Sequence, residues 1–451
     1  MLLRPSALAR TARRAAAFAF VLAVFAALTP AVHAQIIAGN QQAVGGVKFD
    51  ADGMIRNATV AEKGQFQQAV LDAIDDVPAD MAEQGEMRKV SLKRLDAALR
   101  DCAARGTAVP DEIRCLAGLQ GIRYVVALPE QNDIVLVGPA EGWKVADDGT
   151  VVGKTTGKPV LLLDDLLVAL RAVNLPAPSV FSCSIDPSEE GRRNVQQLKA
   201  RSSDPRQAAA ALETALGPQE ITVAGVPADS HFAGVMVAAD YRMKQIGMGL
   251  TPSPVPGLPS FLEMMRSTKR AENMMPRWWL EPNYGTILSD EDGLAWEITE
   301  AGVKTMTEND LFAADGSRKQ TGTSDPVSRQ WAETMTARYK DLSVAEPVFG
   351  QLQGCMDLAV AATLIVRKDL LAKSQCNLPM LIKEQGTAQL ATPRHVASKS
   401  SFARKDRGWV IACGGVQLNP WAIIDRTETR AELAQVRRQI AATETSSWWS
   451  N

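Results

Sequence analysis

The sequence predicts an α+β protein, in which hairpins and helices are mixed along the chain and pack as two domains rather than as a doubly wound sheet. Three observations support this class. Acidic-Gly turns separate short runs of strand-forming residues, and apolar residues recur at helical spacing in several longer stretches. Strands and helices do not alternate regularly, and the chain has no repeat of fixed period.

Acidic-Gly turns mark the predicted hairpins at residues 50–53, 147–149, 290–293 and 315–316. An Asp-Gly pair supplies the positive φ angles that tight hairpins need. A calcium-binding loop is the alternative, because the pattern D-x-D-G recurs. Leu294 stands where an EF-hand loop needs its next Asp or Asn, so hairpin turns are the prediction.

The remaining elements follow from local patterns in chain order. Ser91 is a helix cap before an apolar helical face that includes Leu95 and Leu99. The later patterns predict a hairpin of strands at 122–128 and 133–138, a strand at 159–163 with a helix after it, a strand at 178–185, a polar helix that Asp186-Pro187 starts, a helix at 205–216, a strand at 220–224, a helix at 230–248, a Pro-rich loop at 251–259, an antiparallel section at 277–306, helices at 325–341 and 345–370, strands near 408–416, and a last helix at 427–442.

These elements divide into five regions. They are a signal peptide (1–34), a partly helical N-terminal segment (35–88), a smaller α/β domain (89–175), a main α+β domain (176–443) and an aromatic tail (444–451).

Residues 1–34 have the order of a secretory signal peptide. Four arginines and no acid precede the apolar run at 15–32, and Val32-His33-Ala34 places small residues at positions −3 and −1. Cleavage after Ala34 makes Gln35 the first mature residue. An uncleaved membrane anchor is the alternative, because the apolar run is nearly long enough to span a bilayer. We therefore expect an exported, soluble protein of the periplasm or the exterior.

The charge of the mature chain argues against some partners. Removing the four arginines from the 49 basic residues leaves 45 against 51 acidic ones, a net charge of −6. Nucleic acids and anionic lipids need a basic patch, so neither is an expected partner. The apolar stretch at 355–366 is too short to span a membrane and is predicted to be a buried helix, so we expect no transmembrane segment after signal cleavage.

Six cysteines permit disulfides in an exported protein. Cys102 and Cys115 flank a predicted helix–turn–helix and are the first pair that we expect to bond, whereas the pairing of the other four stays open. The mature chain has two histidines, His231 and His395, and no C-x-x-C motif. We therefore expect neither a metal site nor a cofactor.

The stretch GTVVGKT at 149–155 looks like a phosphate-binding loop. It is one residue short of that motif, and Gly157-Lys158-Pro159 breaks the helix that must follow. We therefore predict no nucleotide site.

The predicted helix at 230–248 carries the weak catalytic candidates His231, Asp240 and Arg242. The helical rise separates His231 from Arg242 by about 16 Å, too far for one reacting atom. Asp240 and Lys244 are four residues apart and are predicted to form an ion pair. A partly buried helix whose His and Arg bind neighbouring loops is the alternative to a catalytic role.

Aromatic residues supply the binding candidates Trp278, Trp279, Tyr284, Trp448 and Trp449. Alternation along a strand sends one ring of the first tryptophan pair inward and the other outward. An outward ring beside Tyr284 could stack on a sugar or a protein partner, whereas core packing is the alternative. The terminal pair is either disordered or docked into a groove on the same or another chain.

The chain resembles an uncharacterised bacterial family of exported proteins, defined by a domain of unknown function. The resemblance rests on FSCSIDPSEEG at 181–191, HFA at 231–233, DYRMK at 240–244 and GL at 249–250, and it also includes GPAEGW at 138–143 and LDD at 163–165. It extends over roughly residues 90–425. It implies no activity and no catalytic residue.

We expect a protein that binds a protein or glycan partner, or that builds an envelope assembly, and self-association stays open. The absence of a recognisable catalytic motif in a long chain favours that function over catalysis. Binding predicts an exposed patch of Trp278, Trp279 and the 448–449 tail. The alternative is an envelope hydrolase, which predicts that His231, Asp240 or Arg242 meets a Ser, a Cys or a second acid in one pocket.

Overall fold

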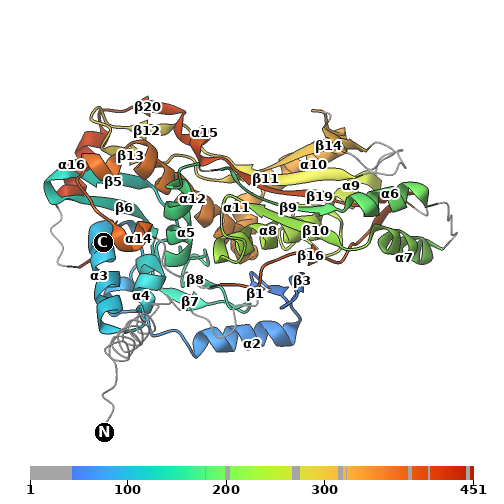
Figure 1. Ribbon diagram of the computed structural model, residues 1–451, viewed down its shortest axis with the longest axis horizontal. Coiled ribbons are helices and arrows are strands. Elements are labelled where there is room, and N and C mark those ends of the chain that lie inside the picture. Colours follow the sequence, from blue (N-terminus) through green and yellow to red (C-terminus); the bar gives the residue numbers. More distant parts are fainter. Residues whose placement is uncertain are drawn as a thin grey trace, which may run out of the picture.

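The computed structural model describes residues 43–177, 179–198, 204–266, 275–312, 318–320, 322–383, 389–404, 407–442 and 447–451. Helices and strands are interspersed along these residues, so the predicted α+β class is confirmed. Two sheets dominate the fold (Figure 1). The smaller lies at the left of the view and the larger at the right, with helix α12 (Pro347–Arg367) between them.

The larger sheet is mostly antiparallel, and its central strands bury one face. Along strand β9, for example, Phe181, Cys183 and Ile185 are buried, whereas Ser182 and Ser184 are partly exposed. In spatial order its ten strands are β1 (Ala43–Val44), β2 (Val47–Phe49), β3 (Met54–Asn57), β16 (His395–Val396), β10 (Gln219–Ala224), β9 (Phe181–Pro187), β19 (Cys413–Leu418), β11 (Pro276–Pro282), β14 (Val303–Phe312) and β15 (Arg318–Gln320).

The smaller sheet joins distant parts of the chain. In spatial order its seven strands are β20 (Thr427–Thr429), β12 (Ile287–Ser289), β13 (Ala295–Glu297), β5 (Tyr124–Leu128), β6 (Asp133–Ala140), β4 (Gly85–Ser91) and β21 (Trp449–Ser450). Residues from both sides of position 175 therefore share one sheet. Two separate hairpins complete the strands: β7 (Trp143–Val145) with β8 (Val151–Gly153), and β17 (Ser401–Arg404) with β18 (Arg407–Val410).

Three of the acidic-Gly turns form hairpins as predicted. Residues 50–53 join β2 to β3, residues 147–149 join β7 to β8, and residues 290–293 join β12 to β13. Gly53 and Gly149 have φ angles of 84° and 87°, which a side chain rarely adopts. The fourth turn, at 315–316, lies outside the described residues.

The predicted longer helices are present with shifted ends, whereas the short helices at 261–266, 379–382 and 420–424 were not predicted. The predicted strand at 159–163 does not form, because only Pro159 makes an isolated bridge there. The helices have the bounds α2 (Val60–Leu71), α3 (Leu92–Arg105), α4 (Asp111–Arg114), α5 (Leu163–Val173), α6 (Glu189–Gln197), α7 (Pro205–Leu216), α8 (His231–Gly247), α9 (Phe261–Arg266), α10 (Pro326–Ala337), α11 (Tyr339–Ala345), α13 (Leu370–Lys373), α14 (Pro379–Ile382), α15 (Pro420–Ile424) and α16 (Leu433–Ala441), and the short 3₁₀ helices are η1 (Ala79–Met81), η2 (Leu116–Gly118) and η3 (Pro129–Gln131).

Two predicted helix starts are wrong. Strand β9 continues through Pro187, so Ser188 caps α6 instead of Asp186, and its hydroxyl accepts from Gly191 N–H at 3.0 Å. The predicted last helix at 427–442 begins only at Leu433, because residues 427–429 add strand β20 beside β12. Sheet pairing overrides the local helical pattern at both places.

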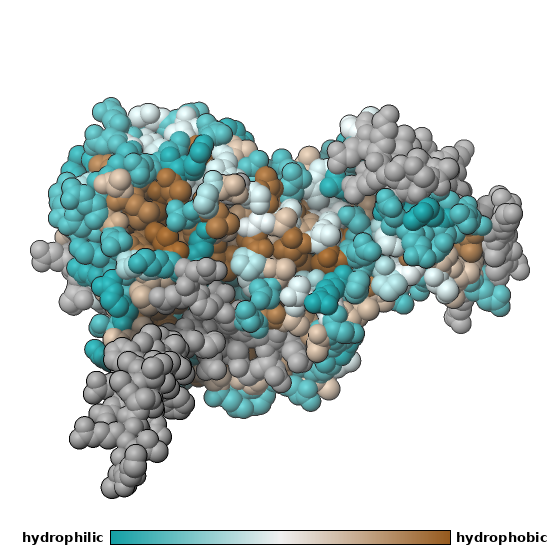
Figure 2. All heavy atoms as spheres, viewed as in Figure 1, coloured by the Kyte–Doolittle hydropathy of each residue, from teal (hydrophilic) through white to brown (hydrophobic). Residues whose placement is uncertain are grey.

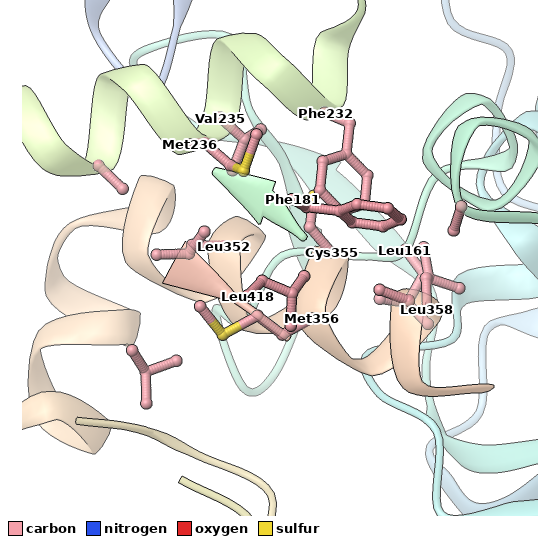
Figure 3. Close-up of a cluster of buried hydrophobic side chains, with 14 of the residues drawn as sticks. Leu161, Phe181, Phe232, Val235, Met236, Leu352, Cys355, Met356, Leu358 and Leu418 are labelled. Carbon is pink, nitrogen blue, oxygen red and sulfur yellow. The ribbon is translucent and has the colours of Figure 1, made fainter. Parts of the chain in front are cut away.

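Helix α12 is a buried helix, as predicted for residues 355–366. Among the described residues it is the one helix long and apolar enough to cross a membrane, and 83% of that apolar window is buried inside the protein. Figure 3 shows Leu352 and Met356 of α12 in the same cluster as Val235 and Met236 of α8. Hydrophobic residues also reach the surface in the left and central parts of the face in Figure 2.

Candidate functional site

Three helices bring an acid, an imidazole and a thiol together. Asp165 lies in the first turn of α5, His231 is the first residue of α8, and Cys355 lies in the middle of α12. Ser230 caps α8 by accepting from Ala233 N–H at 3.2 Å, which fixes where that helix begins. All three groups line one recess, which we call the His231 recess.

Asp165 orients the imidazole of His231. The His231 Nδ1 atom lies 3.0 Å from each carboxylate oxygen of Asp165. The two side chains are 13% and 6% exposed. Nδ1–H therefore donates to Asp165, which leaves the lone pair of the neutral imidazole on Nε2. Within the described part of the chain, no hydrogen bond is made by His231 Nε2.

The pKa of His231 is raised above its ordinary value of 6.5. Burial lowers this pKa, but the negative charge and the hydrogen bond of Asp165, with a further contribution from Asp164, outweigh it. The imidazole is therefore easier to protonate than a free histidine, and Asp165 stabilises the protonated form.

Cys355 is not an activated thiol. Burial raises the pKa of its thiol well above the usual 9, and the charge and hydrogen bond of Asp165 raise it further. The side chain is 1% exposed. The thiol is therefore protonated and donates to Asp165, so it holds the carboxylate in place rather than acting as a nucleophile.

The remaining lining of the His231 recess is mostly apolar. It includes Leu161 and Leu358, which Figure 3 shows in the same region as Cys355. The recess has a volume of about 10 Å³, close to the space of one water molecule. Gln351 adds a polar atom to this lining, because its Oε1 is buried and accepts no hydrogen bond among the described residues.

Comparison with known proteins supports the resemblance seen in the sequence. Residues 183–261 match the family described as Protein of unknown function (DUF1598). The chain matches no curated protein and no solved structure. The DUF1598 segment begins in β9 and ends at the start of α9, so it contains His231 but neither Asp165 nor Cys355.

The other catalytic candidates of the DUF1598 segment have separate partners. Asp240 forms the predicted ion pair with Lys244 at 2.8 Å, and Lys244 Nζ also donates to the carbonyls of Ile185 and Gly414 at 2.9 and 3.0 Å. Burial raises the pKa of Asp240 to about 7. Arg242 donates to Glu346, so the structure does not join either residue to His231.

The first tryptophan pair, downstream of the DUF1598 segment, alternates as predicted. Trp278 is fully buried, and its ring centre lies 4.4 Å from that of Trp331. Trp279 points to the other face of β11, where Arg277 lies over its ring at 4.7 Å and its Nε1–H donates to Glu281 at 2.6 Å. Tyr284 is 5% exposed and donates to the buried Asp357.

Trp448 and Trp449 dock on their own chain. Trp449 pairs with Val90 at the edge of strand β4, and the Arg88 guanidinium lies over its ring at 5.2 Å. Both tryptophan side chains are partly buried. The predicted exposed patch is therefore not formed, because Trp278 is in the core and Trp279 and the tail belong to two different sheets.

The predicted Cys102–Cys115 disulfide is not present in the structure. All six cysteines lie in the described residues and all are free thiols. Cys115 is completely buried at the end of α4, whereas Cys102 lies partly exposed on α3. The described residues contain no cluster of three metal-ligating side chains.

The apparent phosphate loop is occupied by the chain's own carboxylate. Glu141 accepts from the backbone N–H groups of Thr155 and Thr156 at 2.8 and 2.9 Å. These hydrogen bonds lower the pKa of Glu141 to about 2, although burial opposes them. The amides that a phosphate would need are therefore already used.

Sequence reasoning missed Asp165 and Cys355 as members of the site. Asp165 belongs to the LDD stretch of the family resemblance, which was the one signal that could have drawn attention to it. Cys355 carried no signal beyond its residue type, because only tertiary packing brings α12 to α5 and α8.

Proposed function

We propose that this protein is a hydrolase in which His231, oriented by Asp165, activates a water molecule. The observation that carries the proposal is the 3.0 Å contact of His231 Nδ1 with Asp165 in a recess that leaves Nε2 without a described partner. From the sequence, we expect an enzyme to bring His231 together with a second acid in one pocket, and Asp165 is such an acid. The exposed aromatic patch, which was the condition for a binding protein, is not formed.

The chemistry follows from the two nitrogens of the imidazole. Neutral His231 accepts a proton at Nε2 as the water oxygen attacks an electrophilic carbonyl carbon at the mouth of the recess. Asp165 stabilises the imidazolium through Nδ1–H. The new C–O bond then replaces the bond to the leaving group, which takes the proton from Nε2. An ester or an amide is therefore the substrate class that this pair could hydrolyse.

Substitution of the histidine tests the proposal. Mature protein is assayed against a panel of p-nitrophenyl esters and peptide anilides. We expect H231N to lower kcat/KM by about 10²- to 10⁴-fold, the usual contribution of a general base. H395A is the matched control, because His395 is exposed on β16. An active wild type that is unaffected by H231N, or a wild type inactive on the whole panel, contradicts the proposal.

Trp279 favours a second candidate, the binding of a protein or glycan partner in an envelope assembly. Its partly exposed ring stands on the open face of the larger sheet beside Arg277 and Glu281. Isothermal titration with cell-wall glycan fragments tests this candidate. We expect wild-type binding that W279A loses, and equal heats for the two proteins would exclude the Trp279 face.

Either function acts outside the cytoplasm in our proposal, because residues 1–34 have the features of a signal peptide. Mass spectrometry of the protein recovered from its native host tests this directly. A mature chain that starts at Gln35 is expected, and an intact Met1 form would contradict export by cleavage.

A further inference from the structure

Gln351 faces the His231 recess because of helical spacing. It stands four residues before Cys355 on α12, and side chains four apart lie on one face of a helix. Gly354 and Leu358 complete the same stripe, and all four residues line the recess. Cys355 contacts Asp165, so the face of α12 that carries Cys355 and Gln351 is the face turned towards Asp165 and His231.

The Gln351 amide oxygen needs a hydrogen-bond donor. Its Oε1 is buried and has no hydrogen-bond partner in the described part of the chain. A buried acceptor without a donor is unfavourable, and such atoms commonly bind an ordered water. His231 lines the same recess, and Nε2 of its neutral imidazole is also an acceptor without a described donor.

We infer that Gln351 is a positioning residue, whose Oε1 and His231 Nε2 together hold one water molecule in the recess. The volume of about 10 Å³ has room for one. Both protein atoms accept, so the water donates both of its hydrogens and keeps its oxygen lone pairs for the open side. That orientation is the one a nucleophilic water requires, so this inference rests on the proposed hydrolase and assigns the residue that aims its water.

A crystal structure of the mature wild type, grown above the pKa of His231, tests the water site without any substrate. We expect one ordered water within about 2.6–3.2 Å of both Gln351 Oε1 and His231 Nε2. Q351M fills a similar volume but has no acceptor, and it should lose this water. Q353M is the matched control, because Gln353 lies on the same helix but its amide donates to Ala301 O at 3.3 Å, outside the recess.

Kinetics separates this inference from the proposed function. If Gln351 aims the water, Q351M lowers kcat by about tenfold or more and leaves KM nearly unchanged, whereas Q353M changes neither. A water that remains in place in Q351M, or an active wild type without a water on both atoms, overturns the role of Gln351. An ordered water on both atoms in a wild type that hydrolyses nothing leaves the water site intact and overturns the hydrolase instead.

Discussion

The substitution Asp165→Asn tests whether the bond between Asp165 and His231 is a charged one. Asparagine keeps an oxygen that can accept from His231 Nδ1–H, but it removes the negative charge. Burial then acts on His231 against the smaller contribution of Asp164 alone, so the pKa of His231 should fall below its wild-type value. Two-dimensional NMR of the imidazole protons across a pH series measures this shift.

The same variant should be less stable, and by an amount that depends on pH. The side chains are 13% and 6% exposed, so solvent screens their interaction little. Hydrogen bonds to charged groups contribute about 1.5–3 kcal/mol and neutral ones about 0.5–1.5 kcal/mol. Where His231 is neutral, D165N exchanges a bond to a carboxylate for a bond to a neutral amide, so we expect the free energy of unfolding to fall by about 1 kcal/mol or less. Where His231 is protonated in the wild type, the attraction between the two charges is lost as well, and we expect a fall of about 2 kcal/mol.

The sign of the pH dependence follows from the raised pKa. A base whose pKa is higher in the folded state stabilises the protein fully below its unfolded pKa, and that contribution is lost as the pH rises through the folded value. Urea unfolding of wild type and D165N at about pH 5.5 and about pH 8.5 therefore gives the larger difference at the lower pH. D101N is the control, because Asp101 is an exposed acid on α3. An equal loss at both pH values, or an unchanged His231 pKa, would refute the charged pair.

Three further predictions concern other buried groups. Burial raises the pKa of Asp357 to about 7, so the free energy of unfolding of the wild type should fall as the pH rises from about 4 to about 7. Urea unfolding of D357N should show a smaller change in this free energy over the same pH range. W449A should expose the edge of β4, lower the free energy of unfolding by about 1–3 kcal/mol and cause concentration-dependent association in size-exclusion chromatography. E141Q should remove the stability that Glu141 gives above about pH 4.5 and loses as the pH falls towards 2, so its midpoint in urea should drop at neutral pH and match the wild type in acid. Unchanged unfolding curves would contradict each assignment.

Local patterns predicted the elements that local physics determines. The helix from His231 to Gly247 begins at a Ser cap, and the hairpin at 147–149 turns on a glycine with positive φ, so neighbouring residues are enough to specify both. The cap at Asp186 was predicted wrongly because Asp186 is paired in the sheet, with Glu220 of β10 as its partner. Sheet pairing depends on residues that no local pattern contains.

Local sequence patterns could not predict the candidate site either, because its residues are far apart in the chain. Asp165 and His231 are 66 positions apart, and Cys355 follows much later on a third helix. A sequence can show that each residue exists, but packing of α5, α8 and α12 decides that the three meet. The tail shows this dependence on distant residues most clearly, because Trp449 near the end of the chain pairs with Val90 in its first quarter.

The boundaries of the DUF1598 segment decide how the site can be studied. The segment supplies His231, which is the proposed base, together with the helix that positions it. Asp165, which orients the base, and Gln351, which faces the same recess, both come from outside residues 183–261. An isolated segment would therefore present an imidazole without its acid and without the apolar lining of the recess. Its His231 should titrate near the ordinary value of 6.5 rather than above it. The raised pKa is therefore a property of the three packed helices, and a chain that contains all three is needed to measure it.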